Sequence, residues 1–166
     1  MERVLLVPAG EAPHRKIEPE PGSDVRLEMV NVVAADDELL EACDLEVVRE
    51  GPSYTFRTLE LLHEERPGSE LTFLMGADVA ASLESWRQPE RVLELARVGV
   101  AVRPGTELDE AEAAMERLGA SAAVIRMPEL GVSSTRIRRR IAQGRPIRYL
   151  VPDPIVELIR GRGLYA

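Results

Sequence analysis

The sequence has few of the residues that build covalent cross-links or histidine-rich metal sites. Its 166 residues contain one cysteine, Cys43, which excludes an internal disulfide and a cysteine-based metal cluster. The two histidines, His14 and His63, lie too far apart in the sequence to form a metal site on their own. We therefore expect no metal site built by the protein itself, and the scarcity of cysteine is consistent with a cytoplasmic location.

Long hydrophobic runs are also missing. No apolar segment approaches the roughly 18 residues of a membrane-spanning helix, and the run at residues 4–7, with Pro8 after it, is too short for a signal peptide. Positive charge is limited too, because the net charge is −8 at pH 7. We expect neither a membrane nor a nucleic acid as partner. The arginines near residue 138 are a local cluster, which suits a small phosphorylated ligand.

What the sequence does contain is an alternation of apolar segments and helical patterns. Its 45% hydrophobic and 30% charged residues are typical of a folded globular chain. Strands are predicted at residues 4–7, 43–48, 71–75, 98–102 and 122–127. Helices are predicted at residues 24–35, 56–65, 79–83, 90–96, 108–118 and 154–160. This repetition with short connections predicts a single α/β domain over residues 1–166, with a doubly wound parallel sheet.

Residues 131–141 predict a further helix, ended by Gly144, whose first turn is rich in hydroxyl groups. Those hydroxyl residues are Ser133, Ser134 and Thr135. Free backbone N–H groups and the positive end of the helix dipole favour an oxyanion at such a turn. Arg138 and the arginines around it could bind phosphate oxygens. Taken alone, a cap on a solvated basic helix is the commoner meaning of such a stretch.

Two further segments follow predicted strands, where ligands bind in open α/β sheets. The long loop after the first strand carries His14, Arg15 and Lys16, which could hold phosphates or simply face solvent. Gly76 and Asp78 follow the third predicted strand, and a carboxylate in that position commonly binds ribose hydroxyl groups. Asp is also a frequent helix cap, so this motif alone is a weak signal.

The turn at residues 51–55 leads into the helix at residues 56–65, and either Ser53 or Thr55 is expected to cap that helix. Trp86, the only tryptophan, stands among polar residues before the next helix. Its ring could cover the edge of the core or provide a platform on which a flat ring stacks. Position in the sequence does not separate these two roles.

Taken in order, these segments resemble the nicotinate-nucleotide adenylyltransferases of the HxGH nucleotidylyltransferase superfamily. The matching segments are Val7-Pro8-Ala9-Gly10 with Ala12-Pro13-His14-Arg15, Gly51-Pro52-Ser53-Tyr54-Thr55, Gly76-Ala77-Asp78 with Trp86, Val132-Ser133-Ser134-Thr135 with Ile137-Arg138, and Tyr149-Leu150-Val151-Pro152 with Gly163-Leu164-Tyr165. Each is short, but their order and spacing make the set specific. Ser53-Tyr54-Thr55 and Trp86 resemble the branch that acts on pyridine mononucleotides, and a sister enzyme for phosphopantetheine would lack both.

The resemblance implies a Rossmann-like nucleotidylyltransferase fold and a role in NAD biosynthesis. AMP would pass from ATP to nicotinate mononucleotide, giving deamido-NAD and pyrophosphate, with Mg²⁺ accompanying ATP. By this resemblance, the catalytic residues are His14, Arg15, Lys16 and Arg138, the ATP-binding residues are Gly76, Asp78, Ser133, Ser134, Thr135 and Arg138, and the mononucleotide-binding residues are Tyr54, Thr55 and Trp86. Asp78 would face ribose, and Trp86 would stack on the pyridine ring. Catalysis would depend on positioning and on stabilisation of phosphoryl charge.

One departure from the family is large, because its amino-terminal glycine-rich turn and His-x-Gly-His motif have no counterpart here. The first strand of this chain matches the second of the family, so the central strand and its helix are missing. We therefore expect the strands at residues 4–7 and 71–75 to be separated, with unpaired backbone groups that cost roughly 1–3 kcal/mol each. We also expect these 166 residues to catalyse poorly or not at all.

Three explanations are open. Met1 lies inside a longer protein, which we favour, or the chain is a fragment, or another strand closes the sheet, for example in a homo-oligomer. The alternative functions are accordingly a non-catalytic nucleotide-binding protein, an inactive truncated fragment, and a related adenylyltransferase for another phosphorylated substrate. The sequence leaves open whether the pyridine substrate is the acid or the amide.

Overall fold

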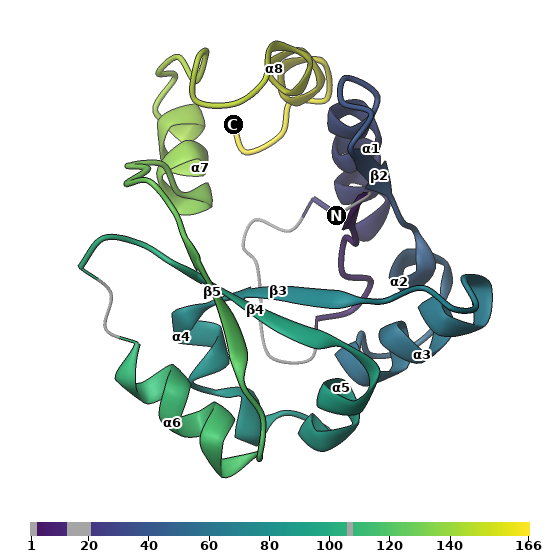
Figure 1. Cartoon of the computed structure of the whole chain (residues 1–166). Helices are drawn as coiled ribbons and strands as arrows, with labels where there is room; N and C mark the ends of the chain where they lie inside the picture. The colour runs from purple at the N-terminus through teal and green to yellow at the C-terminus, as the bar shows by residue number, and fades with distance from the viewer. Residues whose placement is uncertain (1–2, 13–20, 106–107) are drawn as a thin grey trace. The chain divides into compact units, whose positions relative to one another are not determined.

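The computed structural model describes residues 3–12, 21–105 and 108–166. The chain forms two compact units, Met1–Ser53 with Gly131–Ala166, and Tyr54–Leu130. We call them the first and the second unit. Each has its own parallel sheet and its own apolar core among the described residues, and Figure 1 labels the elements of both.

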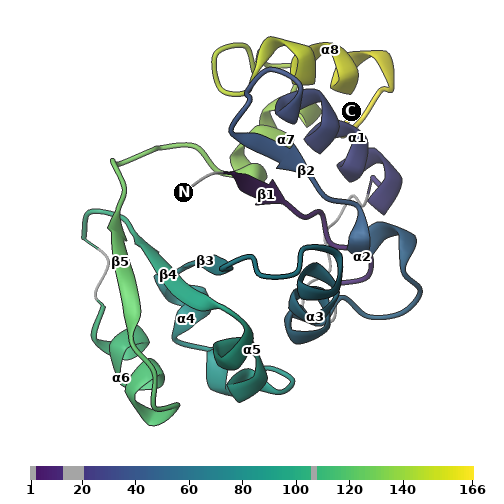
Figure 2. The same cartoon turned by 45° about the vertical axis from the view of Figure 1, so that its right-hand side comes forward.

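The first unit is built on a two-stranded parallel sheet. Its elements are β1 (Val4–Leu6), α1 (Ser23–Ala34), β2 (Leu40–Ala42), α2 (Leu45–Val48), α7 (Ser134–Ala142) and α8 (Asp153–Gly161). β1 pairs with β2 so that Val4 lies opposite Leu40. The helices come from both ends of the chain, and Figure 2 shows α1 beside α8, with which it is in contact.

The core of the first unit joins three helices. Its buried members are Ile137, Ile147, Ile155, Val156 and Ile159. Ile155 and Ile159 lie one turn apart on α8, and Met29 and Val32 of α1 pack against this cluster. Met29 and Val32 of α1 therefore have their apolar partners on α7 and α8.

The second unit is built on a three-stranded parallel sheet in the order β3-β4-β5. Its elements are α3 (Thr55–Glu65), β3 (Thr72–Gly76), α4 (Ala77–Ala80), the 3₁₀ helix η1 (Leu83–Ser85), α5 (Pro89–Leu95), β4 (Arg97–Val102), α6 (Asp109–Arg117) and β5 (Ala122–Arg126). Met75, Val98 and Val100 lie on one face of this sheet and form a buried cluster with α4, η1 and α6. This arrangement positions the carboxyl end of β3, where Gly76 leads directly into α4.

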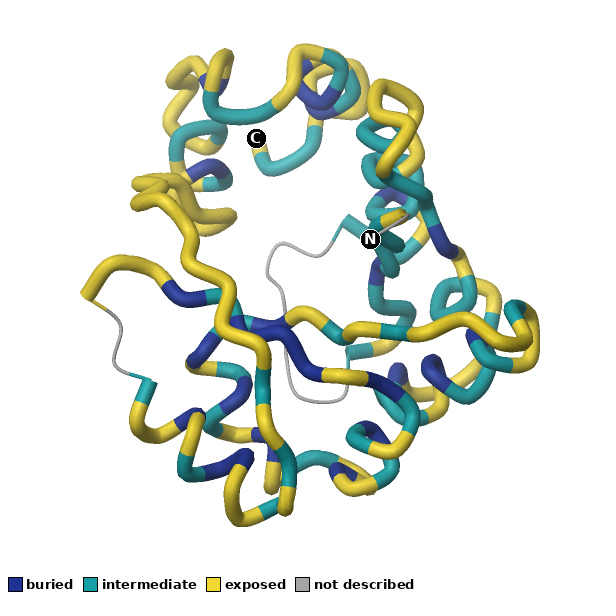
Figure 3. The backbone as a smooth tube through the Cα atoms, viewed as in Figure 1, coloured by how far each residue is buried: buried dark blue, intermediate teal, exposed yellow. Residues whose placement is uncertain are grey.

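The opposite face of the same sheet is much less covered. Leu74 of β3 is 44% exposed and Ile125 of β5 is 40% exposed. Gly99 of β4 lies between them, and a Cβ there would be 2.6 Å from Leu74 Cδ2. Figure 3 shows that β5 is exposed along most of its length.

One predicted strand is wrong. Residues 43–48 alternate in polarity, but the strand of this region is the shorter segment Leu40–Ala42, and Leu45–Val48 forms α2. The Asp44 carbonyl accepts hydrogen bonds from the N–H groups of Val47 at 2.8 Å and Val48 at 3.0 Å, which is a helical turn. The helix predicted at residues 79–83 is also displaced, because α4 ends at Ala80 and η1 follows.

The predicted separation of the first and third strands is confirmed. Among the described residues, no ladder joins the sheet of β1 and β2 to the sheet of β3, β4 and β5. β3 pairs only with β4, so its other edge has no partner strand in the described part of the chain. None of the described helices has the length and apolar character needed to span a bilayer.

Candidate active site

The segment after β1 is fixed by hydrogen bonds to its backbone. The N–H of Gly10 donates to Ser53 Oγ at 3.0 Å. The Arg26 guanidinium of α1 donates to the carbonyls of Ala9 at 2.5 Å and Gly10 at 3.0 Å. Glu11 forms a parallel bridge with Pro52. These hydrogen bonds and the bridge anchor the chain before the predicted phosphate loop as far as Glu11.

Ser53 has a different role from the one predicted. The residue that caps α3 is Tyr54, with no side-chain cap, so neither Ser53 nor Thr55 serves as the cap. The Ser53 hydroxyl is buried and accepts the Gly10 N–H instead. The sequence alone could not show this hydrogen bond, because Gly10 and Ser53 lie far apart along the chain. The predicted phosphate-binding residues His14, Arg15 and Lys16 lie outside the described residues.

The first turn of α7 has the predicted arrangement. Ser133 caps the helix, and its Oγ accepts the N–H of Arg136 at 3.2 Å. Ser134 and Thr135 then begin the helix, and their exposed hydroxyl and N–H groups have no hydrogen-bond partner among the residues that the structure describes. This turn therefore offers unused donors together with the positive end of a helix dipole.

The arginines of α7 divide into two groups. Arg136 donates to the Gly131 carbonyl at 2.6 Å, and Arg140 donates twice to the Pro146 carbonyl, at 2.9 and 2.7 Å. These two fix the loops at either end of the helix. Arg138 is partly buried and has no partner within the described ranges. Arg139, which is exposed, has no partner there either, so the contact of Arg138 with phosphate stays a prediction.

The carboxyl end of β3 brings Gly76 and Asp78 together. A Cβ on Gly76 would lie 2.6 Å from Asp78 Oδ1, so the carboxylate occupies the space that a side chain would need. Asp78 is exposed, lies in the first turn of α4 and forms no hydrogen bond to another described residue. A free carboxylate at this edge of a parallel sheet can accept hydroxyl protons from a sugar.

An aromatic group lies around the segment before α5. The ring of Tyr54 stacks on Phe56 with centroids 6.0 Å apart, and the Arg87 guanidinium carbon lies 5.7 Å from the Tyr54 centroid. Trp86 meets Phe73 edge-on at 6.0 Å. Trp86 packs against the core of the second unit but is only partly buried, so part of its side chain remains exposed. We call Tyr54, Phe56, Phe73, Trp86 and Arg87 the aromatic group.

Comparison with known proteins identifies the family. A cytidylyltransferase-like family model matches residues 1–140. A Roseiflexus sp. (strain RS-1) protein named "Probable nicotinate-nucleotide adenylyltransferase" is 42% identical over 168 residues, covering 99% of this chain and 83% of the relative. This chain belongs to that adenylyltransferase family. A Rubrobacter xylanophilus relative of the same name is 40% identical over 169 residues, covering 99% of this chain and 78% of its own length.

A solved structure shares the fold. Nicotinic acid mononucleotide adenylyltransferase from Plasmodium falciparum, complexed with NaAD, matches with a TM-score of 0.76, covering 99% of this chain and 83% of that one. A second structure of that enzyme, complexed with APC, gives a TM-score of 0.75. Both are 16% identical to this chain, so the likeness establishes the fold alone. The predicted Rossmann-like α/β fold is confirmed.

Each unit, taken by itself, carries groups of a different chemistry. In the first unit, the hydroxyl and N–H groups of α7 and Arg138 can bind phosphate oxygens. In the second unit, Asp78 and the aromatic group can bind sugar and a flat ring. The sequence did not single out Arg87, whose guanidinium lies over the Tyr54 ring.

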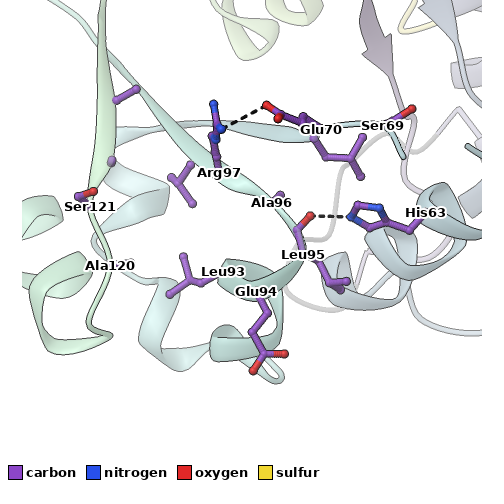
Figure 4. Close-up of a pocket in the computed structure, with 14 residues that line it drawn as sticks. His63, Ser69, Glu70, Leu93, Glu94, Leu95, Ala96, Arg97, Ala120 and Ser121 are labelled. Carbon is purple, nitrogen blue, oxygen red and sulfur yellow. Dashed lines mark hydrogen bonds and ion pairs between the residues drawn. The ribbon is translucent and has the colours of Figure 1, made fainter. Parts of the chain in front are cut away.

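One cavity of the second unit lies away from these residues. It has a volume of about 770 Å³ and is lined from the amino ends of the strands in the second unit. Figure 4 shows His63 beside the Leu95 carbonyl, at 2.7 Å, and the ion pair of Arg97 with Glu70, at 3.2 Å. Ligands of open α/β sheets bind at the carboxyl ends, so this cavity is not the adenylyltransferase site.

Nucleotidyltransferases of this kind generally use a divalent metal with ATP. The described residues contain no group of three or more His, Cys, Asp or Glu side chains that could hold a metal ion. The hydroxyl, N–H and guanidinium groups of α7 can bind phosphate, and they fit a metal that arrives on the phosphates of ATP.

Proposed function

We propose that the protein transfers AMP from MgATP to nicotinate mononucleotide in NAD biosynthesis. The 5′-phosphate oxygen of the mononucleotide attacks the α-phosphorus of ATP and forms a new P–O bond. The bond from the α-phosphorus to the bridging oxygen breaks, and pyrophosphate leaves. The products are deamido-NAD and pyrophosphate, and no covalent enzyme intermediate is needed.

The observation that carries this proposal is the match of 99% of the chain to relatives named for the reaction, at 42% identity. The reaction asks the protein mainly to align two phosphorylated substrates and to stabilise phosphoryl charge. The hydroxyl, guanidinium and carboxylate groups described above are of the kinds that bind phosphate and sugar. NaAD, which the related Plasmodium enzyme binds, is the dinucleotide product of the same reaction.

We assign the ATP phosphates to α7. Ser133 holds the turn in shape through its cap, and Ser134, Thr135 and Arg138 then donate to phosphate oxygens. The unpartnered state of Arg138 within the described chain supports this role, since a guanidinium already committed to a carbonyl would have to give up that bond. His14, Arg15 and Lys16 are assigned to the loop over the reacting phosphates from the family resemblance.

We assign the mononucleotide and the sugar to the second unit. Trp86 provides the face on which the pyridine ring stacks. Tyr54 and Thr55, at the start of α3, are assigned to the same substrate from the family resemblance. Gly76 leaves room for Asp78 to turn its carboxylate toward a ribose. We further propose that residues 1–166 act as one domain, that the protein works in the cytoplasm, and that it forms homo-oligomers through an open sheet edge.

The test is pyrophosphate release from ATP, Mg²⁺ and nicotinate mononucleotide, measured with the 166 residues and with the reading frame that contains them. We expect weak release from the 166 residues, which lack His-x-Gly-His, and full release once such a motif is supplied upstream. If the extended reading frame releases no pyrophosphate, the adenylyltransferase proposal is wrong. Binding of ATP without any release would favour the second candidate, a non-catalytic nucleotide-binding protein.

Two variants separate the two substrates. Trp86→Ala should weaken mononucleotide binding about tenfold and leave ATP binding within about twofold, because one stacked ring contributes roughly 1–3 kcal/mol. Arg138→Met should weaken ATP binding and leave mononucleotide binding nearly unchanged, because it removes a charge-assisted contact with an ATP phosphate. Isothermal titration of each variant with each substrate measures the affinities. An equal loss of affinity for the two substrates would contradict separate roles for Trp86 and Arg138.

A further inference from the structure

The apolar layer on the covered face of the sheet in the second unit does not extend over the edge strand β5. Val100 of β4 lies opposite Val124 of β5 in the parallel ladder, so the two side chains project from the same face of the sheet. Val100 is only 1% exposed, because it lies in one buried cluster with Ala111 and Met115 of α6. Val124 is 43% exposed. The helix α6 therefore covers β4 and leaves the same face of β5 open.

A cavity of about 350 Å³ lies between α6 and the strands β4 and β5. Val100, Ala111 and Met115 form its buried floor, and Ala122 and Val124 form its side on β5. The two alanines contribute single methyl groups, which leaves this space unfilled. Protein interiors contain few voids larger than a water molecule, whereas pockets of this size with apolar walls hold small ligands. The cavity of about 770 Å³ described above shares residues 120–122 with this one.

The charge at this cavity is negative. Among the described residues that line it, the charged ones are Glu112 and Glu116, which lie one turn apart on α6. Both are exposed, so they lie where the cavity opens to solvent, and neither forms an ion pair with another described residue. Like charges at this spacing repel each other. Arg117, the next residue of the helix, is bound to Glu84 instead. A cation at the opening would relieve the repulsion between the two carboxylates.

We propose that this cavity is a second ligand site, which binds a small organic cation with an aromatic or branched apolar body. The apolar part replaces water against Val100, Met115 and Val124, and the cationic group stays at the opening beside the two glutamates. None of the described residues that line the cavity is assigned above to ATP or to the mononucleotide. Because both of those substrates are anionic, the glutamates also disfavour them here. The proposal therefore does not rest on the adenylyltransferase function.

The experiment follows the side-chain methyl group of Met115 by NMR in protein labelled at its methionine methyl groups. Of the methionines that the structure describes, Met115 is the one that lines the cavity, and Met29 and Met127 serve as internal references. The probes are benzylammonium, benzyl alcohol and benzoate, which share a ring and differ in charge. We expect benzylammonium to shift the Met115 signal with saturation in the millimolar range. Benzyl alcohol should bind more weakly, and benzoate most weakly.

Variants of the two glutamates test the charge. Glu112→Gln and Glu116→Gln should each weaken benzylammonium binding roughly 2- to 5-fold, as expected for exposed charge contacts. Binding of benzyl alcohol should stay within about twofold. Glu110→Gln is the matched control, because Glu110 is an exposed glutamate of α6 outside the described lining of the cavity, and it should leave the affinity for benzylammonium nearly unchanged.

A further variant tests the place of binding. Ala122→Leu fills the cavity from β5 and should abolish binding of benzylammonium and benzyl alcohol. Urea denaturation checks that this variant is folded. The glutamine variants change only exposed side chains, so they decide the proposal even if Ala122→Leu is unstable.

Four results would overturn the proposal. The absence of a saturable Met115 shift with benzylammonium at millimolar concentration would show that the cavity binds no such cation. Equal affinities for the three probes would show that charge has no part in binding. An equal loss of affinity in Glu110→Gln and in the two cavity variants would show a general effect of net charge. Unchanged binding by a folded Ala122→Leu variant would place the probe elsewhere. Pyrophosphate release tests the adenylyltransferase function separately from all four.

Discussion

Gly10 shows how one residue can decide the course of a functional loop. A Cβ at this position would lie 2.0 Å from the carbonyl oxygen of Glu46, which belongs to the backbone and cannot move aside without shifting α2. The absence of a side chain is what allows the chain after β1 to run against α2, with the Gly10 N–H bonded to Ser53. The segment that leads to His14, Arg15 and Lys16 therefore depends on a glycine for steric reasons.

Gly10→Ala is expected to destabilise the protein by roughly 1–3 kcal/mol, because the added methyl group overpacks a contact between two backbones. The measurement is the free energy of unfolding from urea denaturation. Gly161→Ala is the control, since nothing lies within 4 Å of a Cβ there and Gly161 is the last residue of α8. We expect the control to be neutral or slightly stabilising, and equal stability of both variants would contradict the steric explanation.

Individual site residues were predictable where the signal was local. The hydroxyl run before α7 predicted the cap and the free donors, because both depend on residues within one helical turn. Ser53 and Arg87 were not predictable in the same way. The partner of Ser53 is Gly10, and the partner of Arg87 is Tyr54, so both contacts depend on the fold rather than on neighbours in sequence.

At the scale of elements, long periodic segments were predicted well and short ones were not. α3 and β4 begin within one residue of their predicted positions, because the apolar residues of each recur at a regular helical or strand spacing. The segment at residues 43–48 failed, since Leu45, Val47 and Val48 satisfy strand alternation and one turn of helix equally well. β2 has only three residues, which is too short to show any period.

A salt bridge joins two elements of the second unit, and it predicts a pH dependence of stability. Arg117 of α6 donates from Nε and Nη2 to the carboxylate of Glu84 in η1, at 2.9 and 2.6 Å. The hydrogen bonds and charge of Arg117 hold the pKa of Glu84 below its ordinary value. A carboxyl whose pKa is lower in the folded state stabilises the fold above its unfolded pKa, and that stability is lost as the pH falls through the folded pKa.

Glu84→Gln is therefore expected to lower stability at neutral pH and to flatten its loss in acid. Urea midpoints at pH 7 and in the acidic range where glutamates become protonated measure this difference. Glu116→Gln is the matched control, because Glu116 is an exposed glutamate of α6, the helix that carries Arg117, with no ion-pair partner among the described residues. A Glu84→Gln variant whose pH dependence equals that of the original protein would exclude a role for the bridge in acid unfolding.

At the scale of the whole molecule, one unit is a continuous segment of the chain and the other is made of two segments. The second unit is the continuous segment Tyr54–Leu130, whereas the first combines Met1–Ser53 with Gly131–Ala166. The core of the first unit joins α1 to α7 and α8, from both sides of that segment. When the second unit is unfolded, it becomes a long flexible loop that must be closed before this core can form, at an entropic cost of about 4 kcal/mol.

This cost predicts that the two units unfold together, as expected for a single domain. Trp86 fluorescence reports the second unit alone, because this tryptophan packs on its core. Far-UV circular dichroism reports the helices of both. We expect urea transitions from the two probes to coincide within error, which is the usual test of two-state unfolding. A fluorescence transition at clearly higher urea than the dichroism transition would show that the second unit folds alone, and the proposal of one domain over residues 1–166 would then be wrong.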